Sequence, residues 1–286
     1  MTTLSKKIDF AVIVTVNHAN PNGDPLNGNR PRVTYEGFGE ISDVAIKRKI
    51  RNRLMELGHS IFVQSDDNKV DNSPSLRARA EGELGKDVWK DKNLAIKGSC
   101  EKWIDVRAFG QLFAYGEGAK GEGVSIGIRG PVSVHPAFSV IPVLDRSSSI
   151  QITKSVKGDV KDKASDTMGM KHRVDHGVYV FYGSMNPQLA SKTGFSDEDA
   201  QAIKEALRTL LRNDASSARP EGSMTIHKLY WWEHNNPNGQ FSSAKVHRLL
   251  RIKVKEGVEE PNDIEENYDI ELGELLGLKY EVIDGE

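Results

Sequence analysis

The first patterned segment, IDFAVIVTV from Ile8 to Val16, is apolar and β-branched almost throughout. Such a run is typical of a central strand that is buried on both faces. The fifteen residues that follow are rich in Asn, Gly and Pro, which predicts a loop built of turns. The apolar spacing then changes to a helical period over 41–58, with Ser42 or Asp43 as the N-cap and Gly58 at the end.

The rest of the chain alternates between polar insertions and short apolar segments. The predicted elements, in order, are a polar insertion with short helical pieces (62–106), a helix (103–115), strands (124–140), two strands around a charged tip (149–186), a capped helix (196–212), two strands (224–234 and 244–255) and a weak helix (271–278). With the insertions set aside, this order suits a ferredoxin-like βαββαβ core. We therefore expect an α+β fold with one domain over 1–255 and an acidic tail over 256–286.

Charge is distributed unevenly along the 286 residues, although the whole chain has a net charge of only −2. Segment 256–286 contains twelve acidic residues and one basic residue, Lys279, which leaves a net charge of +9 for 1–255. A basic body indicates a polyanion partner, and an ordinary solvated surface is the alternative. The single cysteine, Cys100, excludes an intrachain disulfide and fits a reducing cytoplasm. We expect no signal peptide and no membrane span, because no long apolar run occurs.

The predicted helix over 41–58 has an apolar face and a basic face. Its basic residues are Lys47, Arg48, Lys49, Arg51 and Arg53. Its apolar stripe consists of Ile46, Ile50, Leu54 and Leu57, which should pack on the sheet. Arginine can fork onto phosphate oxygens, and lysine supplies a point charge. The helix therefore predicts a polyanion contact, with a solvated basic face as the alternative.

The loop before this helix offers amide and imidazole donors from His18, Asn20 and Asn22. Its glycines let the backbone approach a ligand closely, so we expect the loop to hold a phosphate or a sugar. It contains no Walker or dinucleotide motif. Asp24 is the one carboxylate in a suggestive place, and a role in the turn N-G-D-P is the stronger interpretation.

The predicted hairpin around 149–186 is also basic. Lysines flank its tip and two methionines, Met168 and Met170, follow it. A projecting hairpin of this kind could wedge an apolar residue against bases, and a surface hairpin without a role is the alternative. His172 and His176 are four residues apart on a predicted strand, a spacing that does not bring them together on a metal. With no HExxH and no CxxC motif, we expect no catalytic residues, no metal and no cofactor.

Taken together, several segments resemble the backbone subunit of CRISPR type I Cascade effectors, a member of the repeat-associated mysterious protein superfamily. The likeness is closest to the type I-C branch and covers most of 1–255. The segments that carry it are the loop NPNGDP, the helix ISDVAIKRKIRNR, DVRAFG at 105–110, IRGPVSV at 128–134, and SIQITKSV with MGMKHRVDHGVY in the hairpin.

This resemblance implies a right-hand shape: a palm like an RNA-recognition motif, fingers at about 62–106 and a β-hairpin thumb at about 147–175. Copies of such subunits stack in a helical filament on the CRISPR RNA, which pairs with target DNA, beside other Cascade subunits. The resemblance implies palm contacts and thumb contacts to the RNA by Ser42, Lys47, Arg48, Arg51, Lys154, Ser155, Met168, Lys171 and His172. The acidic tail departs from the family's pattern, so it either contacts a neighbouring subunit or is disordered.

Two enzymatic alternatives remain beside a non-enzymatic scaffold. Related backbone subunits of type III effectors cut target RNA with an aspartate in the corresponding loop, where Asp24 lies. A guide-processing endoribonuclease would instead use His18 or His172 as general base. The scaffold is the preferred hypothesis, because type I systems leave DNA destruction to a separate nuclease-helicase.

Overall fold

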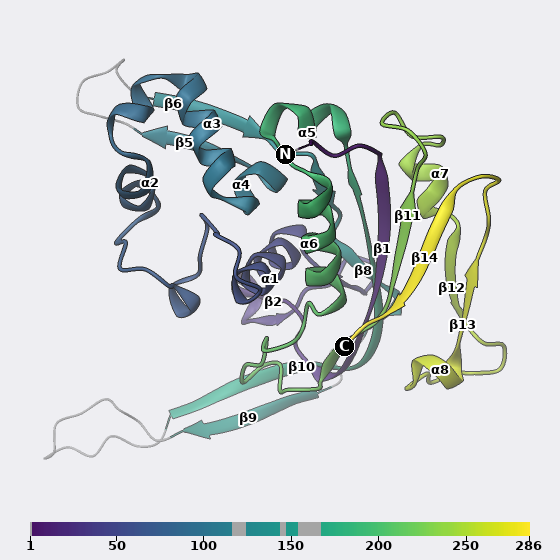
Figure 1. Ribbon diagram of the computed structural model, residues 1–286. Coiled ribbons are helices and arrows are strands. Elements are labelled where there is room, and N and C mark those ends of the chain that lie inside the picture. Colours follow the sequence, from purple (N-terminus) through teal and green to yellow (C-terminus); the bar gives the residue numbers. More distant parts are fainter. Residues whose placement is uncertain (1, 116–123, 144–146, 154–166) are drawn as a thin grey trace, which may run out of the picture.

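The computed structural model describes residues 2–115, 124–143, 147–153 and 167–286. The protein is built around one antiparallel sheet with the strand order β14–β11–β1–β10–β8–β4 (Figure 1), which confirms the predicted α+β class. Its strands are β1 (Ile8–Ala19), β4 (Phe38–Ile41), β8 (Ala137–Pro142), β10 (Thr167–Met185), β11 (Met224–Glu233) and β14 (Lys279–Asp284), and the short β7 (Val132–Val134) also pairs with β10.

Strand β1 lies between β10 and β11 and contributes to two hydrophobic cores. Phe10 and Val12 belong to the core on one face of the sheet, whereas Ala11 and Ile13 belong to the core on the other. Because both faces are covered, most positions of this strand carry apolar side chains. The predicted central strand is confirmed.

Helices α1 (Asp43–Glu56) and α6 (Asp197–Arg208) cover one face of the sheet (Figure 1). Ser42 caps α1 by accepting the backbone N–H of Ala45, and Ser196 begins a capping box at α6. The apolar stripe of α1 is buried at Ile46, Ile50 and Leu54, while Leu57 stays partly exposed. The short α5 (Pro187–Thr193) packs beside them.

The opposite face is covered by a small C-terminal unit. It consists of α7 (Ser243–His247), β12 (Leu250–Val254), α8 (Ile264–Asn267) and β13 (Tyr268–Leu272), and β12 pairs with β13. The predicted strand over 244–255 is therefore a helix followed by a strand. The predicted weak helix over 271–278 is wrong: the chain leaves β13 at Leu272, passes Gly273 and Gly277, and then adds β14 to the sheet.

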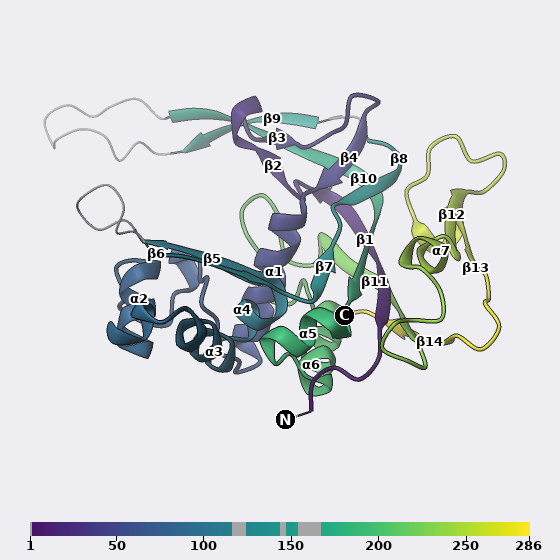
Figure 2. The same cartoon turned by 90° about the horizontal axis from the view of Figure 1, so that it is seen from above.

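Residues 62–115 and 124–129 form a lobe to one side of the sheet, with a small core of their own (Figure 2). Its elements are η2 (Asp66–Asn68), α2 (Leu76–Leu84), η3 (Asp87–Lys90), α3 (Lys92–Lys102), α4 (Ile104–Phe109), β5 (Gly110–Tyr115) and β6 (Val124–Arg129). The prediction of one helix over 103–115 is only half right. Gly110 has a φ of 82°, which ends α4, and β5 then pairs with β6.

The predicted two-stranded hairpin is present and projects beyond the sheet (Figure 1). Strand β9 (Ser147–Thr153) pairs with the first part of β10, while the second part of β10 runs through the sheet beside β1. Lys154 and Ser155 lie outside the described residues. In the loop after β1, β2 (Gly23–Asp24) pairs with β3 (Arg30–Pro31) around the short helix η1 (Pro25–Asn27).

Candidate nucleic-acid interface

A cavity of about 400 Å³ lies against one flank of α1. Its other walls are the loop after β1, the segment 65–68 of the lobe and the loop 210–219 after α6. The charged residues that line it are Arg48, Lys49, Arg53, Arg212 and Arg219, with Glu56, Asp67 and Asp214. Among the described residues, five cations therefore face three carboxylates, which makes the cavity attractive to an anion.

Arg48 connects the cavity to the lobe. Its Nη1 donates to the backbone oxygen of Val63 at 2.6 Å, and Arg48 also lines the cavity. Burial and the nearby charge of Arg51 lower the pKa of Arg48, and Asp105 partly opposes them. Burial and Arg51 thus disfavour the charged form of Arg48. A bound phosphate would stabilise that charged form, because it supplies a counter-charge.

Asp214 holds two of the cavity's cations. It forms an ion pair with Lys49, and the Nε of Arg219 lies 3.2 Å from the same carboxylate. Burial lowers the pKa of Lys49, and the charge of Asp214 opposes that shift. One carboxylate shared by two cations leaves an excess of positive charge on this wall.

Asn22 and Ser42 were predicted as contacts, and the structure brings them together. The Oδ1 of Asn22 accepts hydrogen bonds from the backbone N–H and the hydroxyl of Ser42, both at 2.9 Å. Asn22 lines the cavity, whereas Ser42 caps α1 beside it. The pair therefore fixes the loop against the start of the helix.

Lys47 and Arg51 lie away from the cavity. Lys47 pairs with Asp43 at 3.1 Å, in the first turn of α1. The Nε of Arg51 donates to Asp105 at 3.0 Å, and its guanidinium lies 5.1 Å from the centre of the Phe109 ring. Its side chain is only 13% exposed. The structure thus separates the basic residues of α1 onto different flanks.

His18, Asn20 and Asp24 shape the loop after β1. His18 has a φ of 52°, and its Nδ1 lies 3.2 Å from Asp175. Asn20 is buried and donates to the backbone oxygen of Asn29 at 2.7 Å. Asp24 caps η1 by accepting the N–H of Leu26, which confirms its predicted role in the turn.

The hairpin residues with described positions lie on β10. Met168 pairs with Ile152, Lys171 with Ser149 and His172 with Ser148. Lys171 is half-buried and His172 is 6% exposed. Lys171 and His172 do not line the cavity.

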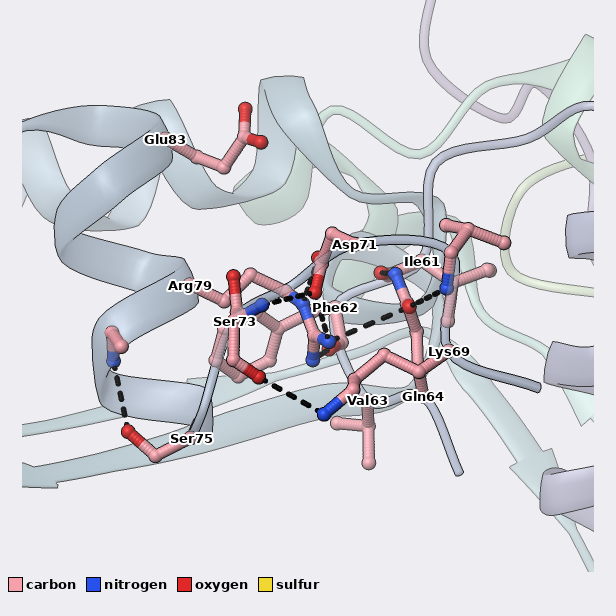
Figure 3. A network of polar contacts seen from close by, with 12 residues as sticks. Ile61, Phe62, Val63, Gln64, Lys69, Asp71, Ser73, Ser75, Arg79 and Glu83 are labelled. Carbon is pink, nitrogen blue, oxygen red and sulfur yellow. Dashed lines mark hydrogen bonds and ion pairs between the residues drawn. The ribbon is translucent and has the colours of Figure 1, made fainter. Parts of the chain in front are cut away.

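Figure 3 shows the polar contacts that hold the segment of the lobe next to the cavity. Arg79 is buried and pairs with Asp71 through two nitrogens, at 2.6 and 2.9 Å. It also donates to the backbone oxygen of Phe62 at 2.8 Å. These bonds close the segment 62–71 into a loop, called here the finger loop. Its residues Ser65, Asp67 and Asn68 border the cavity.

Asn52, Arg212 and Arg219 are among the cavity residues that the sequence did not predict. Asn52 lies in the basic helix without a charge to draw attention, and its Oδ1 is buried with no hydrogen-bond partner in the described part of the chain. The two arginines belong to the polar segment RNDASSAR after α6. The composition of this segment does not show which helix it faces.

Within the ranges that the structure describes, no group of three or more His, Cys, Asp and Glu residues is arranged to hold a metal ion. In the same ranges, no helix is both long and apolar enough to cross a bilayer.

The fold and the cavity together define an α+β protein that presents a cationic cavity on its first helix. This chain belongs to the family of CRISPR-associated protein Cas7, whose family model matches residues 6–273. The family recognised in the sequence segments is thereby confirmed. A Haloferax volcanii relative described as CRISPR-associated protein Cas7 is 24% identical over 229 residues, which cover 76% of this chain and 67% of the relative.

Two solved structures have similar chains. One, described as a CRISPR RNA-guided surveillance complex, pre-nicking, has a TM-score of 0.45 and 15% identity, covering 79% of this chain and 78% of that chain. The other, a CRISPR RNA-guided surveillance complex, has a TM-score of 0.42 and 16% identity, covering 79% of this chain and 68% of that chain.

Proposed function

We propose that this protein is the CRISPR RNA-binding backbone subunit of a type I Cascade surveillance complex, of the type I-C branch. It binds the guide RNA without cutting it, oligomerises along it and presents it for pairing with target DNA in antiviral defence. Other Cascade subunits complete the complex. Family membership supports this assignment, and the cationic cavity against α1 is the observation that carries it.

In this proposal the sheet with α1 and α6 is the palm, a ferredoxin-like unit similar to an RNA-recognition motif. The lobe containing 62–106 is the fingers, and the hairpin within 147–175 is the thumb. The proposed RNA contacts are His18, Asn20, Asn22, Ser42, Lys47, Arg48, Arg51, Lys154, Ser155, Met168, Lys171 and His172. Arg48 and Asn22 have the strongest support, because both border the cavity.

The chemistry of the cavity fits a backbone contact rather than base reading. Base pairing with target DNA carries the sequence information, so the protein needs to recognise phosphate, sugar and shape. Guanidinium, ammonium and amide groups do this for any sequence. A guide of any sequence can then occupy the same cavity.

The test is a binding titration of single-stranded RNAs of unrelated sequence at several salt concentrations. Replacing Arg48 by Gln should weaken binding equally for all sequences. It should also reduce the salt slope by about 0.7, the value for one phosphate contact on a single strand. Lys97→Gln is the matched control, because Lys97 is an exposed lysine on α3 that pairs with Glu101. An unchanged slope in Arg48→Gln would remove Arg48 from the contacts.

Two further arms extend this test. Lys47→Gln shows whether the RNA also follows the flank of α1 outside the cavity.

Magnesium added to the bound RNA shows whether the protein cleaves it. We expect intact RNA, because the carboxylate of Asp24 is engaged in capping η1. Cleavage that disappears in Asp24→Ala would instead establish the ribonuclease.

A further inference from the structure

Strand β14 brings acidic side chains against basic ones on α6 and β11. Glu281 lies 2.9 Å from Lys204, and Asp284 lies 2.8 Å from Lys228. The side chain of Glu286 pairs with Arg208 at 2.6 Å and also contacts Arg212. Figure 1 shows the end of β14 beside the end of α6. The acidic segment predicted to be a tail therefore neutralises specific cations of the body.

Arg212 differs from the other cations in this row, because it lines the cavity. It belongs to the loop after α6 that forms one wall of the cavity, and half of its side chain is exposed. Lys204, Arg208 and Lys228 are not part of the cavity lining. Glu286 is thus the one acidic residue of 279–286 that reaches a cation of the candidate RNA site.

We propose that Arg212 is a phosphate-binding residue of the cavity and that Glu286 competes with RNA for it. This inference rests on the proposed function, since it concerns the same cavity. In the free protein the carboxylate of Glu286 forms an ion pair with the guanidinium of Arg212. In the complex an RNA phosphate replaces the carboxylate, because both are oxyanions that fit the same guanidinium fork.

The magnitude of the competition follows from the solvent exposure of the ion pair between Glu286 and Arg212. An exposed ion pair changes an equilibrium by less than about fivefold, so the polyanion can displace it. The carboxylate therefore lowers the affinity for RNA without abolishing binding. Residues 279–286 lie beyond the stretch that matches the family model. The contact is therefore a property of this chain that the family match does not supply.

Glu286→Gln tests the proposal, with Glu281→Gln as the matched control. Both variants remove one carboxylate from the same segment, but only Glu286 contacts a cavity residue. Glu286→Gln should raise the affinity of the full chain for single-stranded RNA by about two- to fivefold. The salt slope should stay the same, because Arg212 contacts a phosphate in the complexes of both proteins. Glu281→Gln should change neither quantity.

A double-mutant cycle separates Arg212 from Arg208, which Glu286 also contacts. Arg212→Gln should weaken binding, and in that background Glu286→Gln should have no further effect. An equal effect of Glu286→Gln with and without Arg212 would overturn the proposal, as would equal affinities of Glu286→Gln and Glu281→Gln. Wild-type protein that binds no RNA would overturn the proposed function itself. Failure of the competition alone leaves wild-type binding intact, so the two outcomes are distinguishable.

Discussion

At the scale of single residues, Asp9 is a buried charge held by several polar partners. It is fully buried in β1, and its carboxylate lies 2.8 Å from the Nε2 of His234 and 3.4 Å from the Nζ of Lys7. Burial alone would raise its pKa. The hydrogen bond from His234, polar interactions with His247 and Ser243, and the charge of Lys7 together outweigh burial and hold the pKa below its ordinary value.

Asp9→Asn should lower the free energy of unfolding at pH 7 by about 3 kcal/mol, because it removes one partner of a buried ion pair. The folded pKa lies below the unfolded one, so this contribution is present above about pH 4 and is lost as the pH falls further. Urea unfolding at several pH values measures both effects. Asp87→Asn is the control, since Asp87 is an exposed carboxylate paired with Lys90. A wild-type advantage that persists unchanged far below pH 4 would contradict this account.

Residue roles in α1 could be predicted only in part. The apolar stripe at Ile46, Ile50 and Leu54 follows directly from the helical period. The contact that each basic residue makes does not follow from the helical period, because it depends on a partner that is distant in the sequence. Arg51 meets Asp105, and Lys49 meets Asp214, far along the chain from the helix. A basic pattern shows that charge is present but not which charges are already paired.

At the scale of elements, the finger loop depends on one arginine. Arg79 lies on α2 and bonds to Asp71 and to the backbone of Phe62 (Figure 3). It holds the pKa of Asp71 at about 2, chiefly through its hydrogen bond to the carboxylate. The loop's shape, and with it one wall of the cavity, therefore rests partly on a buried guanidinium, beside the hydrogen bonds of its residues 62 and 63 to Arg48 and Asp105.

Arg79→Ala should release the finger loop while leaving the sheet intact. Amide hydrogen exchange should become faster over 63–75 and stay unchanged in β1 and β10, because local opening does not require the sheet to unfold. Arg77→Ala is the control, since Arg77 lies on the same helix and pairs with the half-buried Glu81. Equal protection of 63–75 in the two variants would show that other contacts hold the loop.

Elements with strong local signals were predicted well, and those that depend on pairing were not. Helix α6 begins at the Ser196 capping box that the sequence displays, and β1 coincides with its apolar run. Strand β5 was predicted as helix because its residues suit either state until β6 pairs with it. Strand β14 follows the same rule, since it needs the edge of β11.

At the scale of the whole molecule, the fold determines where charged residues come together. The sheet is covered by helices on one face and by the C-terminal unit on the other, so the cationic cavity opens beside α1 rather than on the sheet itself. The net charge of −2 conceals this arrangement. The acidic residues of β14 lie next to basic residues of α6 and β11, which a linear charge count cannot show.

If the proposed assembly is correct, the number of protein copies bound to one RNA should rise in steps with RNA length. Each copy would occupy a fixed length of backbone. Native mass spectrometry of the protein with RNAs of increasing length measures the copy number directly. A single copy on every RNA would argue against oligomerisation along the guide, while leaving backbone binding by one copy untouched.

The pairing of β1 also has a consequence for the making of the protein. Ala19 pairs with Val174, which comes 155 residues later, and Val16 pairs with Met224. The lobe, in contrast, contains all the residues of its own small core between Phe62 and Ile128. On the ribosome, the lobe can fold before β10 and β11, the two strands that pair with β1, have been synthesised. An apolar, β-branched strand without partners is prone to aggregate, so this interval of synthesis is the stage at which a chaperone would protect the chain.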